Sequence, residues 1–284
     1  MLISIRNLCL YFNNGYSYLK ILYDNPSINV KNPSHNNMVG IDPGLKNHVS
    51  IACDNGDSKS LLIRNSAINR INNYTSTIID RINKELAPYY DKKTFNGMFK
   101  KLKIIKGKLI HKRDVILKNE MHKMTNRIID YSKKNKVGTI VYGYNKGLKQ
   151  KGKLGKENNR KFHGFPHYKL LTMLRYKCPS NGITLIEQEE SYTSKLSCIS
   201  DGVWNYIKGI NDTNVSNGIR GVTFKGKKIR SLFKDKITKK VFHSDINGAY
   251  NILQKYMGKH VDKYWNQLCN PITIKNDFEF MKEL

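Results

Sequence analysis

Acidic residues stand at the ends of three apolar stretches that lie far apart in this chain. Asp42 ends the segment 39–42, an acidic run at 187–190 follows an apolar segment, and Asp245 ends the segment 241–245. Hard divalent cations such as Mg²⁺ choose oxygen ligands. Two such ions, roughly 3.5–4 Å apart, stabilise the attacking and leaving oxygens of an in-line displacement at phosphorus. The pattern therefore predicts metal-dependent phosphodiester hydrolysis, with Mg²⁺ or Mn²⁺ as the cofactor.

Each of these acidic residues also has a simpler interpretation. Asp42 precedes Pro-Gly and fits a turn-forming aspartate. Asp245 stands before an expected helix and fits an N-cap. A glutamate at a strand end is often only a solvated side chain. His243 is interpreted as structural rather than as a ligand, because Mg²⁺ prefers oxygen.

The charge of the chain points to a polyanionic partner. Among 284 residues, Lys and Arg total 50 against 22 Asp and Glu, which gives a net charge of +28 and a pI near 9.8. Abundant Lys, Asn, Ile and Tyr are typical of AT-rich genomes, and this bias accounts for roughly half of the excess. The remainder favours nucleic acid.

Basic and hydroxyl side chains give candidate nucleic-acid contacts. A Lys- and Arg-dense face runs along 100–136, and it is either a solvated surface or a phosphate-facing one. Thr193 and Ser194 either contact phosphate or start a turn. The residues expected to bind nucleic acid are Lys101, Lys108, Lys112, Lys149, Thr193, Ser194 and Lys195.

Cysteine usage and hydropathy indicate a soluble intracellular protein. The five cysteines form no CxxC pair, which argues against a disulfide framework and a closed zinc site. No segment has the features of a signal peptide, and no apolar run approaches the roughly 20 residues of a spanning helix. We expect no membrane partner, and a location in cytoplasm or nucleoid, or in the nucleus of a eukaryotic or viral host.

The order of expected elements is that of an α/β, RNase H-like domain. Strands are expected at 3–12, 16–23, 38–42, 49–53, 60–63, 138–142 and 182–186. Helices are expected from about 68 to Pro88, where proline ends the first, and at 100–136, 167–177 and 246–256. Asn-Asn-Gly at 13–15 predicts a hairpin.

At these residues the chain resembles the TnpB/OrfB proteins of insertion sequences and their Fanzor relatives. The matching motifs are Gly-Ile-Asp-Pro-Gly at 40–44, the strand and loop at 140–150, Glu-Ser-Tyr-Thr-Ser-Lys at 190–195, and His-Ser-Asp-Ile-Asn-Gly-Ala-Tyr-Asn-Ile-Leu at 243–253. The resemblance covers about 3–255. It implies a RuvC-type nuclease domain, transposon association (often named transposase), and RNA-guided DNA cleavage with DNA and guide RNA as partners.

The chain departs from most of that family in three places. Gly143 stands where most members carry their second carboxylate, and a subgroup close to Fanzor takes it instead from the position of Glu190. Strand alternation puts Glu189 on the opposite face, so Glu190 is preferred and Glu189 is the alternative. Only Cys198 remains of the usual zinc ribbon, so no structural zinc is expected. The segment 1–38 is shorter than the family's N-terminal region, which puts guide-RNA handling in doubt.

These observations give a domain division and a ranked set of functions. We expect 1–37 to be a remnant of N-terminal wedge strands, 38–190 with 241–258 to form the RuvC domain, 191–240 to be an inserted nucleic-acid-binding segment, and 259–284 to be a C-terminal tail. The preferred function is a metal-dependent DNA endonuclease that uses Asp42, Glu190 and Asp245. The alternative is a catalytically inactive or truncated nucleic-acid-binding remnant. A ribosome-associated basic protein would explain only the charge.

Overall fold

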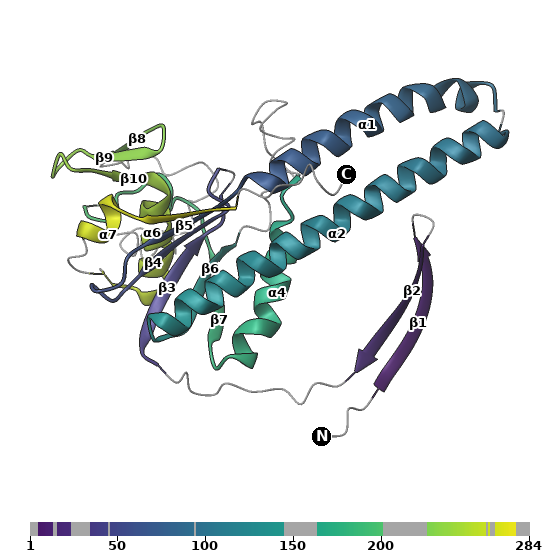
Figure 1. The fold of residues 1–284 in the computed structure, drawn as a ribbon. Helices are drawn as coiled ribbons and strands as arrows, with labels where there is room; N and C mark the ends of the chain where they lie inside the picture. Colours follow the sequence, from purple (N-terminus) through teal and green to yellow (C-terminus); the bar gives the residue numbers. More distant parts are fainter. Residues whose placement is uncertain are drawn as a thin grey trace, which may run out of the picture.

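The computed structural model describes residues 5–13, 16–23, 35–44, 46–93, 95–144, 164–200, 226–259, 261 and 265–276 (Figure 1). The strands are β1 (Ile5–Asn13), β2 (Tyr16–Tyr23), β3 (Asn37–Asp42), β4 (Val49–Cys53), β5 (Leu61–Asn65), β6 (Val137–Tyr144), β7 (Thr184–Glu189), β8 (Gly226–Ile229), β9 (Leu232–Asp235), β10 (Val241–His243) and β11 (Ile272–Asn276). The helices are α1 (Ser66–Asp91), α2 (Gly97–Lys134), α4 (His167–Ser180), α6 (Ser244–Met257) and α7 (Trp265–Cys269).

A six-stranded mixed sheet is the centre of the fold. Its strand order is β11-β5-β4-β3-β6-β7. The strands β3, β4 and β5 lie where strands were expected at 38–42, 49–53 and 60–63, and they pair antiparallel. β6 runs parallel to β3, and β7 runs parallel to β6. The α/β class expected from the sequence is thus confirmed.

The two faces of the sheet are covered by different helices. Val39 and Ile41 of β3 belong to the larger core, which includes residues of α1, α2 and α4. The even-numbered residues of β3 face α6, because successive side chains alternate across a strand. A side chain at Gly40 would clash with the backbone oxygen of Ala249 in α6. A glycine here therefore lets α6 lie close against the sheet.

The helices α1 and α2 form a long antiparallel hairpin that projects from the sheet (Figure 1). The sequence predicted that Pro88 ends the first helix, and this was wrong, because α1 continues to Asp91. Proline lacks only its own N–H donor. The next turn is still closed, with Lys92 N donating to Pro88 O at 3.1 Å. Asn96 caps α2 by accepting from Phe99 N.

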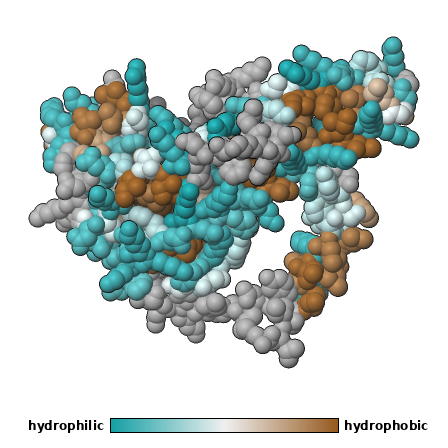
Figure 2. Space-filling view, in the orientation of Figure 1, coloured by the Kyte–Doolittle hydropathy of each residue, from teal (hydrophilic) through white to brown (hydrophobic). Residues whose placement is uncertain are grey.

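Two parts of the chain lie outside the expected nuclease core. The hairpin β1–β2 is antiparallel, as predicted, and exposes apolar side chains such as Phe12 (76% exposed). Figure 2 shows this hydrophobic patch and a second one near the end of the α1–α2 hairpin. The stretch 259–284 was expected to be a tail, yet its strand β11 pairs parallel with β5 and extends the central sheet. The rest of the domain division stays a prediction.

Candidate metal centre

The three predicted carboxylates lie at the ends of adjoining elements. Asp42 is the last residue of β3, Glu190 directly follows β7, and Asp245 lies in the first turn of α6. β6 separates β3 from β7 and runs parallel to both, so the carboxyl ends of these strands meet at one edge of the sheet. The helix α6 packs against β3 near this edge.

The electrostatics of the site show that these carboxylates influence one another. Burial, followed by the charges of Glu190 and Asp245, raises the pKa of Asp42 from 3.8 to about 8. Lys228 opposes this shift. Burial and the charge of Glu189 raise the pKa of Glu190 from 4.5 to about 7. Partly buried carboxylates that repel one another favour a cation between them.

Two glycines provide the space that the carboxylates occupy. A side chain at Gly248 of α6 would clash with Asp42 Oδ2. A Cβ at Gly143 would lie 3.2 Å from Glu190 Oε2 and would meet the side chain of Ile252. The side chain of Glu190 thus occupies the space beside Gly143. The role of Glu190 as a third metal ligand, expected from the resemblance, stays a prediction.

Asp245 does not cap its helix. The N-cap of α6 is His243, whose ring Nδ1 accepts from Asp245 N at 3.3 Å, so the capping interpretation of Asp245 is wrong. Its carboxylate points instead to side chains from other elements. Asn47 Nδ2 donates to Asp245 Oδ2 at 2.7 Å, and Lys228 Nζ lies 3.6 Å from Oδ1. Ser244 Oγ also donates to Oδ1, at 3.2 Å.

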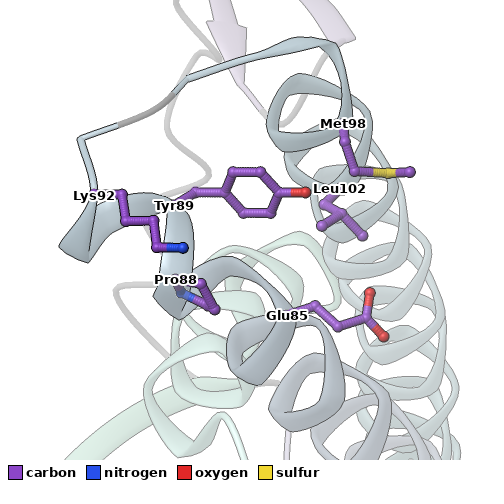
Figure 3. A pocket seen from close by; sticks show the side chains of 6 residues that line it. All are labelled: Glu85, Pro88, Tyr89, Lys92, Met98 and Leu102. Carbon is purple, nitrogen blue, oxygen red and sulfur yellow. The ribbon is translucent and has the colours of Figure 1, made fainter.

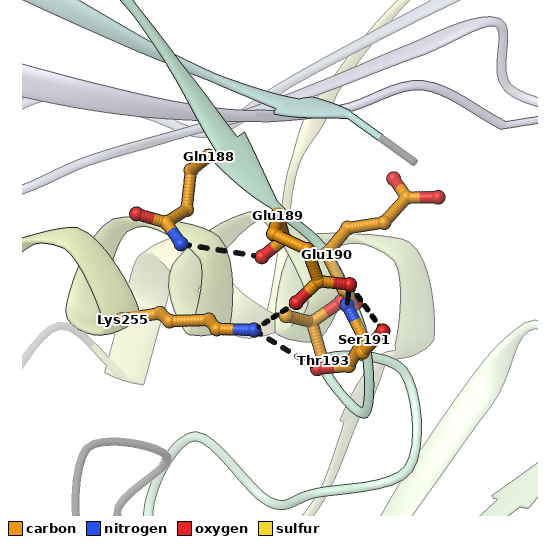
Figure 4. Close-up of polar contacts among 6 residues, drawn as sticks. All are labelled: Gln188, Glu189, Glu190, Ser191, Thr193 and Lys255. Atoms are coloured by element: carbon orange, nitrogen blue, oxygen red, sulfur yellow. Dashed lines mark hydrogen bonds and ion pairs between the residues drawn. The ribbon is translucent and has the colours of Figure 1, made fainter. Parts of the chain in front are cut away.

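Glu189 is held away from the other carboxylates. Its Oε2 pairs with Lys255 Nζ at 2.5 Å, and its Oε1 accepts from Ser191 N at 2.8 Å and from the Ser191 hydroxyl. Figure 4 shows the side chains of Glu189 and Glu190 extending in different directions from the end of β7. Burial raises the pKa of Glu189, but the bonds to Lys255 and Ser191 together outweigh it, so the pKa of Glu189 is lowered. The geometry therefore favours Glu190 over Glu189 as a ligand.

The donor set fits a hard divalent ion, although the side chains are not yet gathered around one point. Within the described ranges, no group of three His, Cys, Asp or Glu side chains is close enough to hold a metal ion. Carboxylate oxygens are the ligands that Mg²⁺ and Mn²⁺ prefer. Burial, and after it the repulsion between carboxylates, raises the pKa of Asp42 and of Glu190, and a dication would offset both effects. Ion binding would require these side chains to move closer together.

The predicted nucleic-acid contacts divide into exposed and buried residues. The exposed ones are Lys101, Lys108, Lys112, Ser194 and Lys195. Lys149 lies outside the described residues. Thr193 is only 4% exposed, and its hydroxyl donates to Glu190 O at 2.8 Å. For Thr193 the turn alternative is favoured, because its hydroxyl supports the turn that follows Glu190, and the nucleic-acid contacts stay predictions.

Several residues of the site were missed by sequence reasoning. Asn247, Asn251 and Gln254 lie on one face of α6 and bond to the backbone of 193–198: Asn247 Oδ1 accepts from Cys198 N at 2.8 Å, and Asn251 Nδ2 donates to the carbonyls of Thr193 and Leu196 at 2.7 and 2.8 Å. Gln254 Nε2 donates to Cys198 O at 3.0 Å. Amides spaced by four and three residues after Asp245 are the signal that could have revealed this contact. We call this set the α6 amide row.

A large concavity elsewhere in the molecule lacks this chemistry. A cavity of about 540 Å³ lies at the far end of the α1–α2 hairpin, lined by Glu85, Pro88, Tyr89, Lys92, Met98 and Leu102 (Figure 3). It contains one carboxylate and is mostly apolar, so it does not compete as a metal centre.

Among the described helices, none is long and apolar enough to cross a membrane.

Comparisons with known proteins identify the class of fold. Residues 167–252 match the family model described as "Cas12f1-like, TNB domain". Two solved structures are similar to this chain at 20% identity and a TM-score of 0.52 each. The match to a Cas12f1–sgRNA–target DNA complex covers 82% of this chain and 41% of the Cas12f1 chain. The match to a CRISPR-Cas12f ternary complex covers 84% of this chain and 42% of the other chain. No curated protein sequence matches.

This similarity confirms the RuvC-like nuclease fold that the motif order predicted. The chain spans less than half the length of the two similar Cas12f chains. Its described core thus has the Cas12f1-like fold, and 167–252 carry the Cas12f1-like domain signature.

Proposed function

We infer that this chain is a metal-dependent DNA endonuclease of the TnpB and Cas12f kind. The observation that carries this proposal is the placement of Asp42, Glu190 and Asp245 at one edge of the sheet, with the raised pKa values of Asp42 and Glu190. Carboxylates with perturbed pKa values are typical of functional sites.

Asp42, Glu190 and Asp245 would hold Mg²⁺ or Mn²⁺. A bound ion of this type polarises the phosphate and lowers the pKa of water, which makes water a nucleophile near neutral pH. The chain's own side chains place the substrate. Lys228 lies beside Asp245 and carries the positive charge that a scissile phosphate attracts. Exposed lysines on α2 add sequence-independent contacts to the nucleic-acid backbone.

Guide RNA and target DNA are the proposed partners. The similar Cas12f structures contain an sgRNA and target DNA. In such complexes, base pairing with the guide selects the target and the protein holds the backbone. The net charge of +28 supports a polyanionic partner. Transposon association, and a place near the Fanzor subgroup that rests on Gly143 and Glu190, belong to the same proposal.

The test is nicking of supercoiled plasmid DNA with and without Mg²⁺ or Mn²⁺. We expect metal-dependent nicking by the wild type and its loss in Asp42→Asn, since one ligand is removed while the shape of the side chain is kept. Asp80→Asn removes an exposed carboxylate on α1 and is the matched control. Equal nicking by wild type and Asp42→Asn would assign the activity to another site or to a contaminant.

The alternative function is nucleic-acid binding without catalysis. It is favoured by one observation, that no three ligand side chains of the described chain are already gathered around one point. A protein of this kind would bind DNA and RNA with the same dependence on salt, but Mn²⁺ would not bind at Asp42. Metal binding therefore separates the two functions more sharply than nucleic-acid binding does.

A further inference from the structure

Asn47 connects the candidate metal centre to a partly buried cation, Arg64. Its side chain is 1% exposed and lies just before β4. Its Nδ2 donates to Asp245 Oδ2 at 2.7 Å, and its Oδ1 accepts from Nε and Nη2 of Arg64, both at 3.4 Å. Arg64 belongs to β5. Three elements distant in sequence thus meet through one amide group.

The chemistry of the neighbours determines how this amide is oriented. A guanidinium group only donates hydrogen bonds, and an ionised carboxylate only accepts them. The amide of Asn47 must therefore turn its oxygen to Arg64 and its nitrogen to Asp245. The reverse orientation would face donor with donor and acceptor with acceptor in a buried place, which is costly.

We propose that Asn47, held by Arg64, is a positioning residue for Asp245. It fixes Oδ2 of that carboxylate and leaves Oδ1, which accepts from Ser244 Oγ and lies beside Lys228, as the oxygen available to a metal ion. This inference rests on the proposed metal centre and names side chains that tune it. Residues that orient a metal ligand by a hydrogen bond typically change metal affinity by about 10–100-fold when they are removed.

A purely structural role for Asn47 is a weaker explanation, because its neighbour already anchors this segment. His48 N donates to Ile63 O at 2.9 Å, and His48 Nδ1 accepts from Asn65 N at 3.1 Å. These bonds fix the segment to β5 without Asn47. Removing the Asn47 amide should therefore disturb the carboxylate more than the fold.

The experiment measures Mn²⁺ affinity by electron paramagnetic resonance, together with the melting temperature in EDTA. We expect Asn47→Ala to weaken Mn²⁺ binding by about tenfold or more. Asn47→Asp keeps the shape but cannot donate, so it should also weaken binding although it adds a negative charge. A structural control is the substitution Asn72→Ala on α1. It removes the 2.8 Å hydrogen bond from Asn72 Nδ2 to Gly164 O and should leave Mn²⁺ affinity unchanged.

The outcomes separate this inference from the proposed function. A wild type that binds no Mn²⁺, or binds it as Asp42→Asn does, overturns the metal centre and this inference with it. Wild-type binding that is lost in Asp42→Asn but unchanged in Asn47→Ala overturns the positioning role alone. Tighter Mn²⁺ binding in Asn47→Asp would show that only local charge matters, and would also overturn it.

Discussion

Asp42→Asn should stabilise the metal-free protein at neutral pH and remove its response to metal. The pKa of Asp42 is raised from 3.8 to about 8 by burial and by the charges of Glu190 and Asp245. In the unfolded chain the group ionises at its ordinary value. The folded state therefore loses stability as pH rises from about 4 to about 8, and asparagine at this position avoids that loss.

The size of the effect follows from the pKa difference. One pH unit corresponds to about 1.4 kcal/mol, so at pH 7 full burial would destabilise the folded state by about 4 kcal/mol. The side chain of Asp42 is only half-buried, and solvent screening reduces this to about 1–2 kcal/mol. For a chain of this size, that corresponds to a rise in melting temperature of roughly 2–8 °C.

The assay is thermal unfolding of wild type and Asp42→Asn in EDTA, followed from pH 4 to pH 8, and then repeated with Mn²⁺. The two proteins should melt together near pH 4 and diverge as the pH rises, and only the wild type should gain stability from Mn²⁺. Asp80→Asn should show neither effect. A variant less stable than wild type at pH 8 in EDTA, or a difference independent of pH, would refute the reasoning.

Three other substitutions test separate parts of the site. Gly248→Ala should keep the stability of α6 or raise it by up to ~1 kcal/mol, because alanine favours a helix. The added methyl group should displace the Asp42 carboxylate and abolish Mn²⁺ binding; unimpaired Mn²⁺ affinity would contradict the close approach of Gly248 to Asp42. Asn251→Ala should cost about 1–3 kcal/mol in denaturant unfolding and speed proteolysis of 193–198, because the Thr193 carbonyl loses this donor and the Leu196 carbonyl keeps the one from Asn247; an unchanged cleavage rate would argue against the α6 amide row. Lys108→Ala should lower the salt dependence of DNA binding by about one counterion, measured by fluorescence anisotropy; an unchanged slope would exclude a phosphate contact.

Much of the sheet, and the places of the candidate ligands at element ends, could be predicted because short-range patterns determine them. Apolar runs bounded by turns predicted β3, β4 and β5, and the period of two along a strand separated Glu190 from Glu189. The positions of Asp42 and Asp245 at element ends followed from the same patterns. Their assigned roles stay predictions until metal binding is measured.

Contacts between distant segments could not be predicted in the same way. An isolated polar residue before a strand, such as Asn47, has no local feature that distinguishes it from a loop residue. Its role depends on Arg64 and Asp245, which only the folded chain brings near. The strand β11 is five residues long at a sheet edge, and its pairing with β5 is likewise a tertiary fact. The prediction that α1 ends at Pro88 was wrong because a proline near a helix end removes one hydrogen bond without stopping the last turn.

The central claim is that Asp42, Glu190 and Asp245 hold a divalent ion. The most direct measurement is anomalous X-ray diffraction from crystals soaked in Mn²⁺. The account predicts an anomalous peak about 2.1 Å from carboxylate oxygens of Asp42 and Asp245, with Glu190 turned toward it. No peak at this edge of the sheet at saturating Mn²⁺, or a peak bound by Glu189 instead of Asp42, would contradict it.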